Sequence, residues 1–210
     1  MKGRLFAGLL VAGVGLTGLA SLTGCGSEEG LVEVYWQFQD GALEPIYPQG
    51  ARDDTCEFLD STGLRFNLRV QLTVAENDAA CSTDEGYEAA GCTVVVQEAF
   101  ECNRGRGVAE PVPISGPNGT PGEDDPGYLM FVEALIEIGD ESFVPSSSCL
   151  LAPGPRVRQV FPGRITDLEV AQFVFLPYSV GSGDAAIDTE LCRPGASQEM
   201  DTETETDTGP

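Results

Sequence analysis

The segment Leu64–Ala75, which reads LRFNLRVQLTVA, decides the fold class of this chain. Its apolar side chains fall on every second position, with polar or small side chains between them. The apolar positions are Leu64, Phe66, Leu68, Val70, Leu72 and Val74. A helix would scatter these residues around its circumference, whereas a strand puts them all on one face. The segment therefore predicts a strand with one face on a core and the other in water, as is typical of antiparallel sheets.

Six other segments predict further strands by alternation or by β-favouring composition. They are Leu31–Gln39, Cys92–Cys102, Val108–Ser115, Tyr128–Ile138, Arg156–Phe161 and Ile165–Leu176. Pro111 and Pro113 restrict the third of these to an edge strand or a loop, because proline cannot donate a ladder hydrogen bond. The segment Tyr128–Ile138 is ambiguous, since Glu133 and Glu137 also suit one face of a helix and apolar residues fall on both faces of a strand. We favour a strand there because the neighbouring segments are strands.

These strands, separated by long turn-rich loops with little sign of helix, predict an all-β fold. We expect an antiparallel β-sandwich of immunoglobulin-like or Greek-key type, with about seven strands and with disulfides that staple it. The domain should span residues 31–195. Residues 196–210 carry several acids and no large apolar residue after Met200, so they predict a disordered acidic tail.

The start of the chain has the features of an export signal. A basic start, Met1-Lys2-Gly3-Arg4, precedes an apolar run from Leu5 to Ala20 and then Leu22-Thr23-Gly24-Cys25. This tetrapeptide, placed directly after an apolar run, resembles the lipobox of bacterial lipoproteins. The resemblance implies a signal peptide at residues 1–24, acyl chains such as palmitate on Cys25, and a lipidated tether at residues 25–30. Several acyl chains on one residue hold a protein on a membrane stably.

Two other interpretations of this segment stay open. One is a cleaved signal without lipid. The other is a permanent transmembrane helix, although the apolar run has 16 residues with four glycines among them, and roughly 20 are needed to span a bilayer. Gly26 follows the cysteine, and the resemblance to lipoprotein sorting rules then implies the outer membrane. We expect the protein in the bacterial cell envelope, on a membrane face that the sequence leaves open.

The chain has seven cysteines, and assigning Cys25 to lipid leaves an even number for disulfides. Cys92 and Cys102 lie at opposite ends of one predicted strand, too far apart to pair. If this strand and Leu64–Ala75 form an antiparallel hairpin, the two outer cysteines meet at its open end and the two inner ones meet at its loop. The last two cysteines then pair with each other. The predicted bonds are Cys56–Cys102, Cys81–Cys92 and Cys149–Cys192.

The composition is strongly acidic. The chain has 11 Lys and Arg against 34 Asp and Glu; without Lys2 and Arg4 the balance is 9 against 34, a net charge of −25, and no lysine remains. Such a surface repels nucleic acid, so we expect no nucleic-acid partner. The chain has no histidine, which excludes a Ser-His-Asp or Cys-His catalytic site and a histidine-ligated zinc site.

Acidic loops offer the remaining candidate chemistry. Calcium takes several oxygen ligands from loops, and three acidic clusters are candidates. They are Asp78/Asp84/Glu85, Glu123/Asp124/Asp125 and Asp184/Asp188/Glu190. None has the Asp-x-Asp-x-Asp-Gly pattern, so calcium stays an alternative to plain solvation and we assign no cofactor, metal ligand or catalytic residue. Loop pairs such as Asp53/Asp54 or Asp84/Glu85 could serve glycoside hydrolysis, but so acidic a chain has such pairs by chance. Trp36 has apolar neighbours on its own face, and we expect it in the core.

A second resemblance concerns the domain itself. Trp36-Gln37-Phe38-Gln39-Asp40-Gly41, the downstream Cys56, the long alternating strand and Phe100-Glu101-Cys102 resemble the layout of uncharacterised bacterial lipoproteins with immunoglobulin-like sandwiches. The resemblance implies a fold and a location but no activity. We therefore expect a non-enzymatic, lipid-anchored extracytoplasmic module for binding, adhesion or an accessory role in the envelope. Besides the membrane, its partner would be an unidentified protein or polysaccharide. The alternatives are a glycosidase-like hydrolase that uses loop carboxylates, and a calcium-stabilised adhesin.

Overall fold

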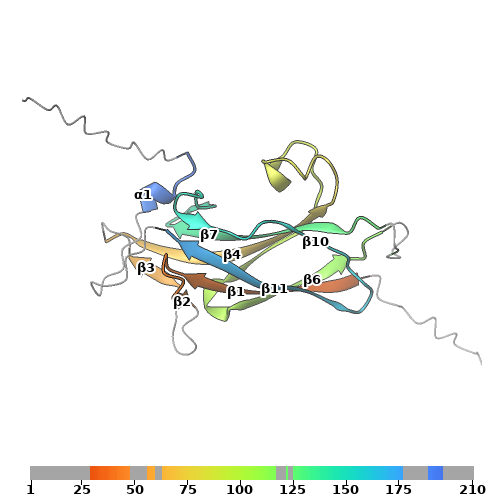
Figure 1. Cartoon of the computed structure of the whole chain (residues 1–210), viewed down its shortest axis with the longest axis horizontal. Coiled ribbons are helices and arrows are strands. Elements are labelled where there is room, and N and C mark those ends of the chain that lie inside the picture. The colour runs from red at the N-terminus through yellow and green to blue at the C-terminus, as the bar shows by residue number, and fades with distance from the viewer. Residues whose placement is uncertain are drawn as a thin grey trace, which may run out of the picture.

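The computed structural model of the protein describes residues 29–47, 56–59, 63–116, 122, 125–176 and 189–195. The expected signal peptide, Cys25 and the acidic tail at 196–210 lie outside these residues. Two β-sheets pack face to face (Figure 1), which confirms the predicted all-β sandwich. Among the described residues, no helix has the length and apolar character needed to cross a membrane.

The first sheet contains β1 (Glu29–Gln39), β2 (Pro45–Tyr47), β6 (Arg106–Pro113), β9 (Leu150–Leu151) and β11 (Ile165–Phe175). The second sheet contains β3 (Glu57–Leu59), β4 (Arg65–Glu76), β5 (Val94–Glu101), β7 (Tyr128–Ile138), β8 (Glu141–Phe143) and β10 (Arg156–Arg158). Short helical turns are η1 (Gly86–Glu88), η2 (Cys102–Arg104) and α1 (Thr189–Cys192). The described part thus has six strands of eight or more residues and five of two or three, against about seven predicted. Most of the short strands fall where the sequence shows no alternation.

The strand order contains the expected Greek-key connection. β4 and β5 form an antiparallel hairpin in the second sheet, and β6 crosses to the first sheet to pair with β1. β7 then returns to pair with β4 on the side opposite β5. A fourth strand that returns beside the first is the signature of a Greek key.

One pairing differs from the antiparallel arrangement that we expected throughout. β1 and β11 run parallel, in register from Leu31 with Ile165 to Gln39 with Val174. They are the first and last long strands of the domain, so the rest of the sandwich is the connection between them. Because no short turn joins these strands, nothing local forces them to run antiparallel.

The core lies between the two sheets and is rich in aromatic rings. Phe38 of β1 stacks on Phe173 of β11 with ring centroids 4.9 Å apart, and both are fully buried. Trp36 is also buried, as predicted; its indole Nε1 donates a 2.8 Å hydrogen bond to the backbone carbonyl of Cys102. That bond gives the one polar atom of the indole a partner inside the core.

β1 begins two residues earlier than the sequence predicts. Glu29 and Gly30 pair with Pro113 and Val112 of β6, so they belong to the sandwich and not to the tether. Glycine is rare in strands, which hid this start. The structure needs glycine here, because a Cβ at position 30 would lie 2.6 Å from the carbonyl oxygen of Phe161.

β11 does not keep one alternation along its length. Leu168 faces the core before residue 169, and Ala171 and Phe173 face it afterwards, so the inward row changes from even to odd positions. The change is a β-bulge, where Glu169 has φ of 63° and the pairing with β1 shifts register. The predicted strand Ile165–Leu176 is therefore confirmed, but its inward-facing row changes at the bulge.

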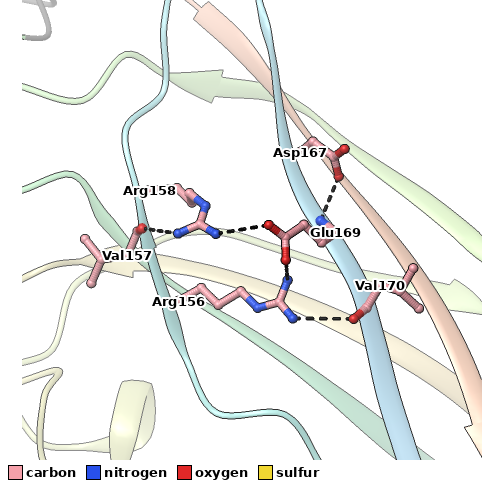
Figure 2. A network of polar contacts seen from close by, with 6 residues as sticks. All are labelled: Arg156, Val157, Arg158, Asp167, Glu169 and Val170. Atoms are coloured by element: carbon pink, nitrogen blue, oxygen red, sulfur yellow. Dashed lines mark hydrogen bonds and ion pairs between the residues drawn. The ribbon is translucent and has the colours of Figure 1, made fainter.

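The bulge places a carboxylate between the two sheets at the edge of the sandwich (Figure 2). Glu169 of β11 lies 3.7 Å from Arg156 and 3.8 Å from Arg158 of β10, and Arg156 also donates to the carbonyl of Val170 at 3.4 Å. The backbone amide of Glu169 donates to Asp167 at 2.7 Å. These contacts link a strand of one sheet to a strand of the other across the open edge.

Three disulfides join the described elements. They are Cys56–Cys102, Cys81–Cys92 and Cys149–Cys192, the pairs that the hairpin geometry predicts. The first ties the start of β3 to the end of β5, and the second closes the loop between β4 and β5. The third fixes α1 to the segment before β9.

Candidate functional site

An open groove lies over the outer face of β7, with a volume of about 880 Å³. Its floor is formed by β7, one wall by the loop between β4 and β5, and the other wall by the segments around β8 and α1. The residues that line it are Thr83–Glu88, Phe131–Glu133, Ser142–Ser146, Ala152, Pro153, Pro155 and Pro194. In Figure 1 the β4–β5 loop and α1 both stand above the sheet that contains β7, on the side away from β1 and β11.

The β4–β5 loop is held on the sheet by a small apolar cluster of its own. Cys81 and Leu129 are buried there, with Tyr87, Cys92 and Phe131 packed against them. The Tyr87 and Phe131 rings meet edge to face with centroids 5.3 Å apart. The loop also needs Gly86, whose φ is 58° and where a Cβ would lie 3.2 Å from the Phe131 ring. Disulfide and ring contacts together fix this wall.

The floor places one carboxylate under the loop. Glu133 follows Phe131 by two positions, so both side chains leave the outer face of β7. The Tyr87 hydroxyl lies beside Glu133 and accepts a 3.1 Å hydrogen bond from the Gln71 amide. Oε2 of Glu133 is shielded from solvent and has no hydrogen-bond partner. This carboxylate oxygen is the least satisfied acceptor of the groove.

The second wall is held by the Cys149–Cys192 disulfide and by an arginine. Ser146 donates its backbone amide to the carbonyl of Cys192 at 2.8 Å, which joins the two segments. Arg193 donates to Glu141 at 2.6 Å, and its guanidinium lies 5.2 Å from the centroid of the Phe143 ring. The hydrogen bond from Arg193 holds the pKa of Glu141 below its ordinary value. A guanidinium between an aromatic ring and a carboxylate is therefore already part of this wall.

The groove combines apolar walls with an excess of negative charge. Asp84, Glu85 and Glu88 are exposed on its rim, above the half-buried Glu133. Burial raises the pKa of Glu133, and the charge of Glu88 raises it further, although the Tyr87 hydroxyl acts in the opposite direction. Within the described ranges, the ion pairs of arginine are all made with other carboxylates. Their partners are Glu33, Glu57, Glu137, Glu141, Glu169 and Glu190.

The calcium candidates do not assemble. Asp78, Asp84 and Glu85 are described, yet no group of three or more potential ligands occurs among the described residues. Asp78 instead accepts the backbone amide of Cys81 at 2.9 Å and shapes the loop. The other two clusters, like the pair Asp53/Asp54, lie wholly or partly outside the described residues.

The groove is not apparent in the sequence, because the residues that line the groove come from five separate segments. Only the pair Asp84/Glu85 was singled out beforehand, and it lies on the rim. One signal was present: Tyr128–Ile138 is apolar on both faces. An outer face with Leu129 and Phe131 needs a cover, and the β4–β5 loop supplies it.

Comparisons with known proteins give little to extend this description. No protein-family model matches the chain, and no curated protein matches it. Among solved structures, a double mutant of the shaft pilin SpaA from Lactobacillus rhamnosus GG aligns with a TM-score of 0.33 and 7% identity. The alignment covers 71% of this chain and 52% of the pilin, so the chain spans about half the length of that protein. The likeness is distant, and what the pilin does stays with the pilin.

The disulfides themselves indicate where the protein resides. Three bonds in one domain form and persist in an oxidising compartment, which is typical of extracytoplasmic proteins. The class defined by the structure is therefore a disulfide-linked β-sandwich of extracytoplasmic type with an acidic, aromatic groove.

Proposed function

We propose that this protein is a lipid-anchored, non-enzymatic binding module of the bacterial cell envelope, and that it holds its partner in the groove over β7. The single observation that supports this proposal is the groove itself, whose two walls are each closed by a disulfide. Walls fixed in this way lose little freedom when a ligand binds, so less of the interaction energy is spent on ordering.

The anchor rests on the lipobox-like Leu22-Thr23-Gly24-Cys25. β1 begins at Glu29, four positions after Cys25. Four residues of extended chain reach at most about 14 Å. A lipid on Cys25 would therefore hold the Glu29 end of the sandwich against the membrane. The groove over β7 would then lie on the side of the sandwich. Gly26 after the cysteine favours the outer membrane by the same lipoprotein resemblance.

Metabolic labelling tests the anchor. The full-length chain, expressed in a bacterium fed an alkyne analogue of palmitate, should take up label and fractionate with membranes. Cys25→Ala should lose both properties, whereas Ser27→Ala should keep them. Label that persists in Cys25→Ala would refute the anchor.

Binding screens test the groove. The mature chain with Cys25→Ser should bind a polysaccharide or a protein from the envelope without turning it over. A substitution at the rim, Glu85→Gln, should weaken that binding more than Glu110→Gln, which lies on the exposed edge strand β6. Equal effects of the two substitutions would place the binding surface elsewhere.

One observation favours a hydrolase as the second candidate. Glu133 is a half-buried carboxyl with a raised pKa near other carboxylates, and glycosidases use such a group as general acid. If the protein releases reducing ends from a polysaccharide and Glu133→Gln abolishes the release, the binding-module proposal is wrong.

A further inference from the structure

We infer that the groove over β7 binds an arginine side chain of a polypeptide partner, with its guanidinium held between the carboxylate of Glu133 and the aromatic wall of Phe131. This inference deepens the proposed function and rests on it. The walls are apolar and the floor and rim are acidic, so the occupant must present both an apolar surface and a positive charge.

The floor of the groove carries negative charge that no arginine of the described residues pairs with. Oε2 of Glu133 is shielded and has no hydrogen-bond partner; the Tyr87 hydroxyl interacts with the same carboxyl group, and the charge that acts on it from Glu88 is also negative. None of the arginines in the described ranges forms an ion pair with Asp84, Glu85, Glu88 or Glu133. Since a shielded carboxylate oxygen without a hydrogen bond is costly, a cation from another molecule gains both an ion pair and a hydrogen bond at Oε2 of Glu133.

The aromatic surface selects the kind of cation. A calcium ion needs several converging oxygens, and the described residues contain no cluster of three or more Asp, Glu, His or Cys side chains that could hold a metal ion. A guanidinium, in contrast, lies well on an aromatic face and donates to a carboxylate in its own plane. The second wall already shows this geometry within the chain: Arg193 lies over Phe143 and bonds Glu141. Phe131 and Glu133 offer the same pair of groups with the arginine missing.

The apolar walls fit the rest of such a segment. Four prolines and Val144 belong to the lining of the groove outside the acidic loop and β7. The methylene stem of an arginine and the neighbouring backbone of its chain can lie along this surface while the charged head reaches the floor. Proline-rich walls are also preorganised, since the proline ring restricts the backbone.

The experiment must separate this site from bulk attraction, because the whole chain has a net charge of −23. The probe is a glycine-rich peptide with two arginines, and the matched control peptide has citrulline, which is neutral and of the same shape, at both positions. Binding to the mature chain with Cys25→Ser is measured by isothermal titration calorimetry at low and at physiological salt. The arginine peptide should bind and the citrulline peptide should not.

Variants locate the contact. Glu133→Gln should weaken arginine-peptide binding by about tenfold or more, because a hydrogen bond to a charged group is lost. Glu88 is exposed, so Glu88→Gln removes no core contact and the variant should fold. It should weaken binding several-fold. Glu98→Gln removes the same charge from an exposed position of β5 outside the groove and should leave binding unchanged.

Several results would overturn the inference. Equal losses of affinity for the arginine peptide in Glu98→Gln and Glu133→Gln would show bulk electrostatic attraction. Equal affinity for the citrulline peptide would show that binding does not depend on the positive charge. Calcium that binds the groove and displaces the peptide at stoichiometric amounts would make it a metal site. If a polysaccharide binds with Glu133 dependence and the arginine peptide does not, the binding module stands and the arginine partner is refuted; if Glu133→Gln abolishes turnover of a polysaccharide, the binding module is itself refuted.

Discussion

Removal of the Cys81–Cys92 disulfide should destabilise the protein less than removal of either other disulfide. The bond closes a loop with a sequence separation of 11, against 46 for Cys56–Cys102 and 43 for Cys149–Cys192. Loop-closure entropy then gives a loss of about 2.8 kcal/mol for the short loop and about 4 kcal/mol for each long one. For a domain of this size, about 2.8 kcal/mol corresponds to a fall in melting temperature of roughly 6–11 °C.

The assay is urea unfolding of paired Cys→Ala variants, followed by the fluorescence of Trp36. This single tryptophan is buried beside Phe100 and Cys102, so its emission reports the sandwich core. Alanine keeps the Cβ of each cysteine and limits the loss of packing around Cys81. If the Cys81/Cys92 variant loses as much unfolding free energy as the Cys56/Cys102 variant, the predicted ranking of the disulfides is wrong. That result would mean that the loop stabilises the sandwich through its contacts on β7 and not through chain entropy.

Three further predictions concern single residues. Gly107→Ala should lower the unfolding free energy by about 1–3 kcal/mol, because the new Cβ would lie 2.4 Å from the Phe100 ring. Gly122→Ala should leave the unfolding free energy unchanged, because its Cβ would meet nothing within 4 Å. Urea titration of both variants tests this difference. Burial raises the pKa of Glu133 above 4.5, and a carboxyl raised by folding stabilises the fold below its ordinary pKa and loses that effect as pH rises through the raised value. The non-titrating Glu133→Gln should therefore gain thermal stability relative to the wild type as pH rises above the ordinary carboxyl pKa, and a difference in melting temperature that stays constant with pH would contradict it. Glu169 has φ of 63°, so Glu169→Gly should be more stable than Glu169→Val by about 1–2 kcal/mol in urea, and equal stability would show that the bulge relaxes.

Alternation in the sequence was a strong predictor where one strand keeps one face inward. The segment Leu64–Ala75 differs by one residue at each end from β4, and Tyr128–Ile138 has the bounds of β7. Along Ile165–Leu176 the alternation predicted the strand but not the change of its inward face. The bulge at Glu169 depends on pairing with β1 and leaves no mark in the local pattern. The three-residue strands β2, β3 and β8 were not predicted, because three residues are too few to show an alternation, whereas β10 lies within the predicted segment Arg156–Phe161.

The candidate site could be predicted less well than the fold. Glu133 looks like an ordinary outward carboxylate of β7 until the disulfide-closed loop covers it. The Tyr87 hydroxyl interacts with it from the loop that the Cys81–Cys92 disulfide closes, about 50 residues earlier in the chain. Cysteine counting could pair the bonds, but it could not show which face of the sheet the closed loop would cover. Long-range packing therefore creates the groove, and local periodicity does not contain it.

The parallel pairing of β1 with β11 has a mechanical consequence. Glu29 lies at the end of the pair where β11 starts, and Phe175 lies at the opposite end. A pull applied at those two residues runs along both strands and shears them past each other. The ladder hydrogen bonds between Leu31 and Gln39 and their partners on β11 would then be strained together, whereas a hairpin pulled from its open end breaks one bond after another. Tension between Glu29 and Phe175 would therefore load this ladder in shear.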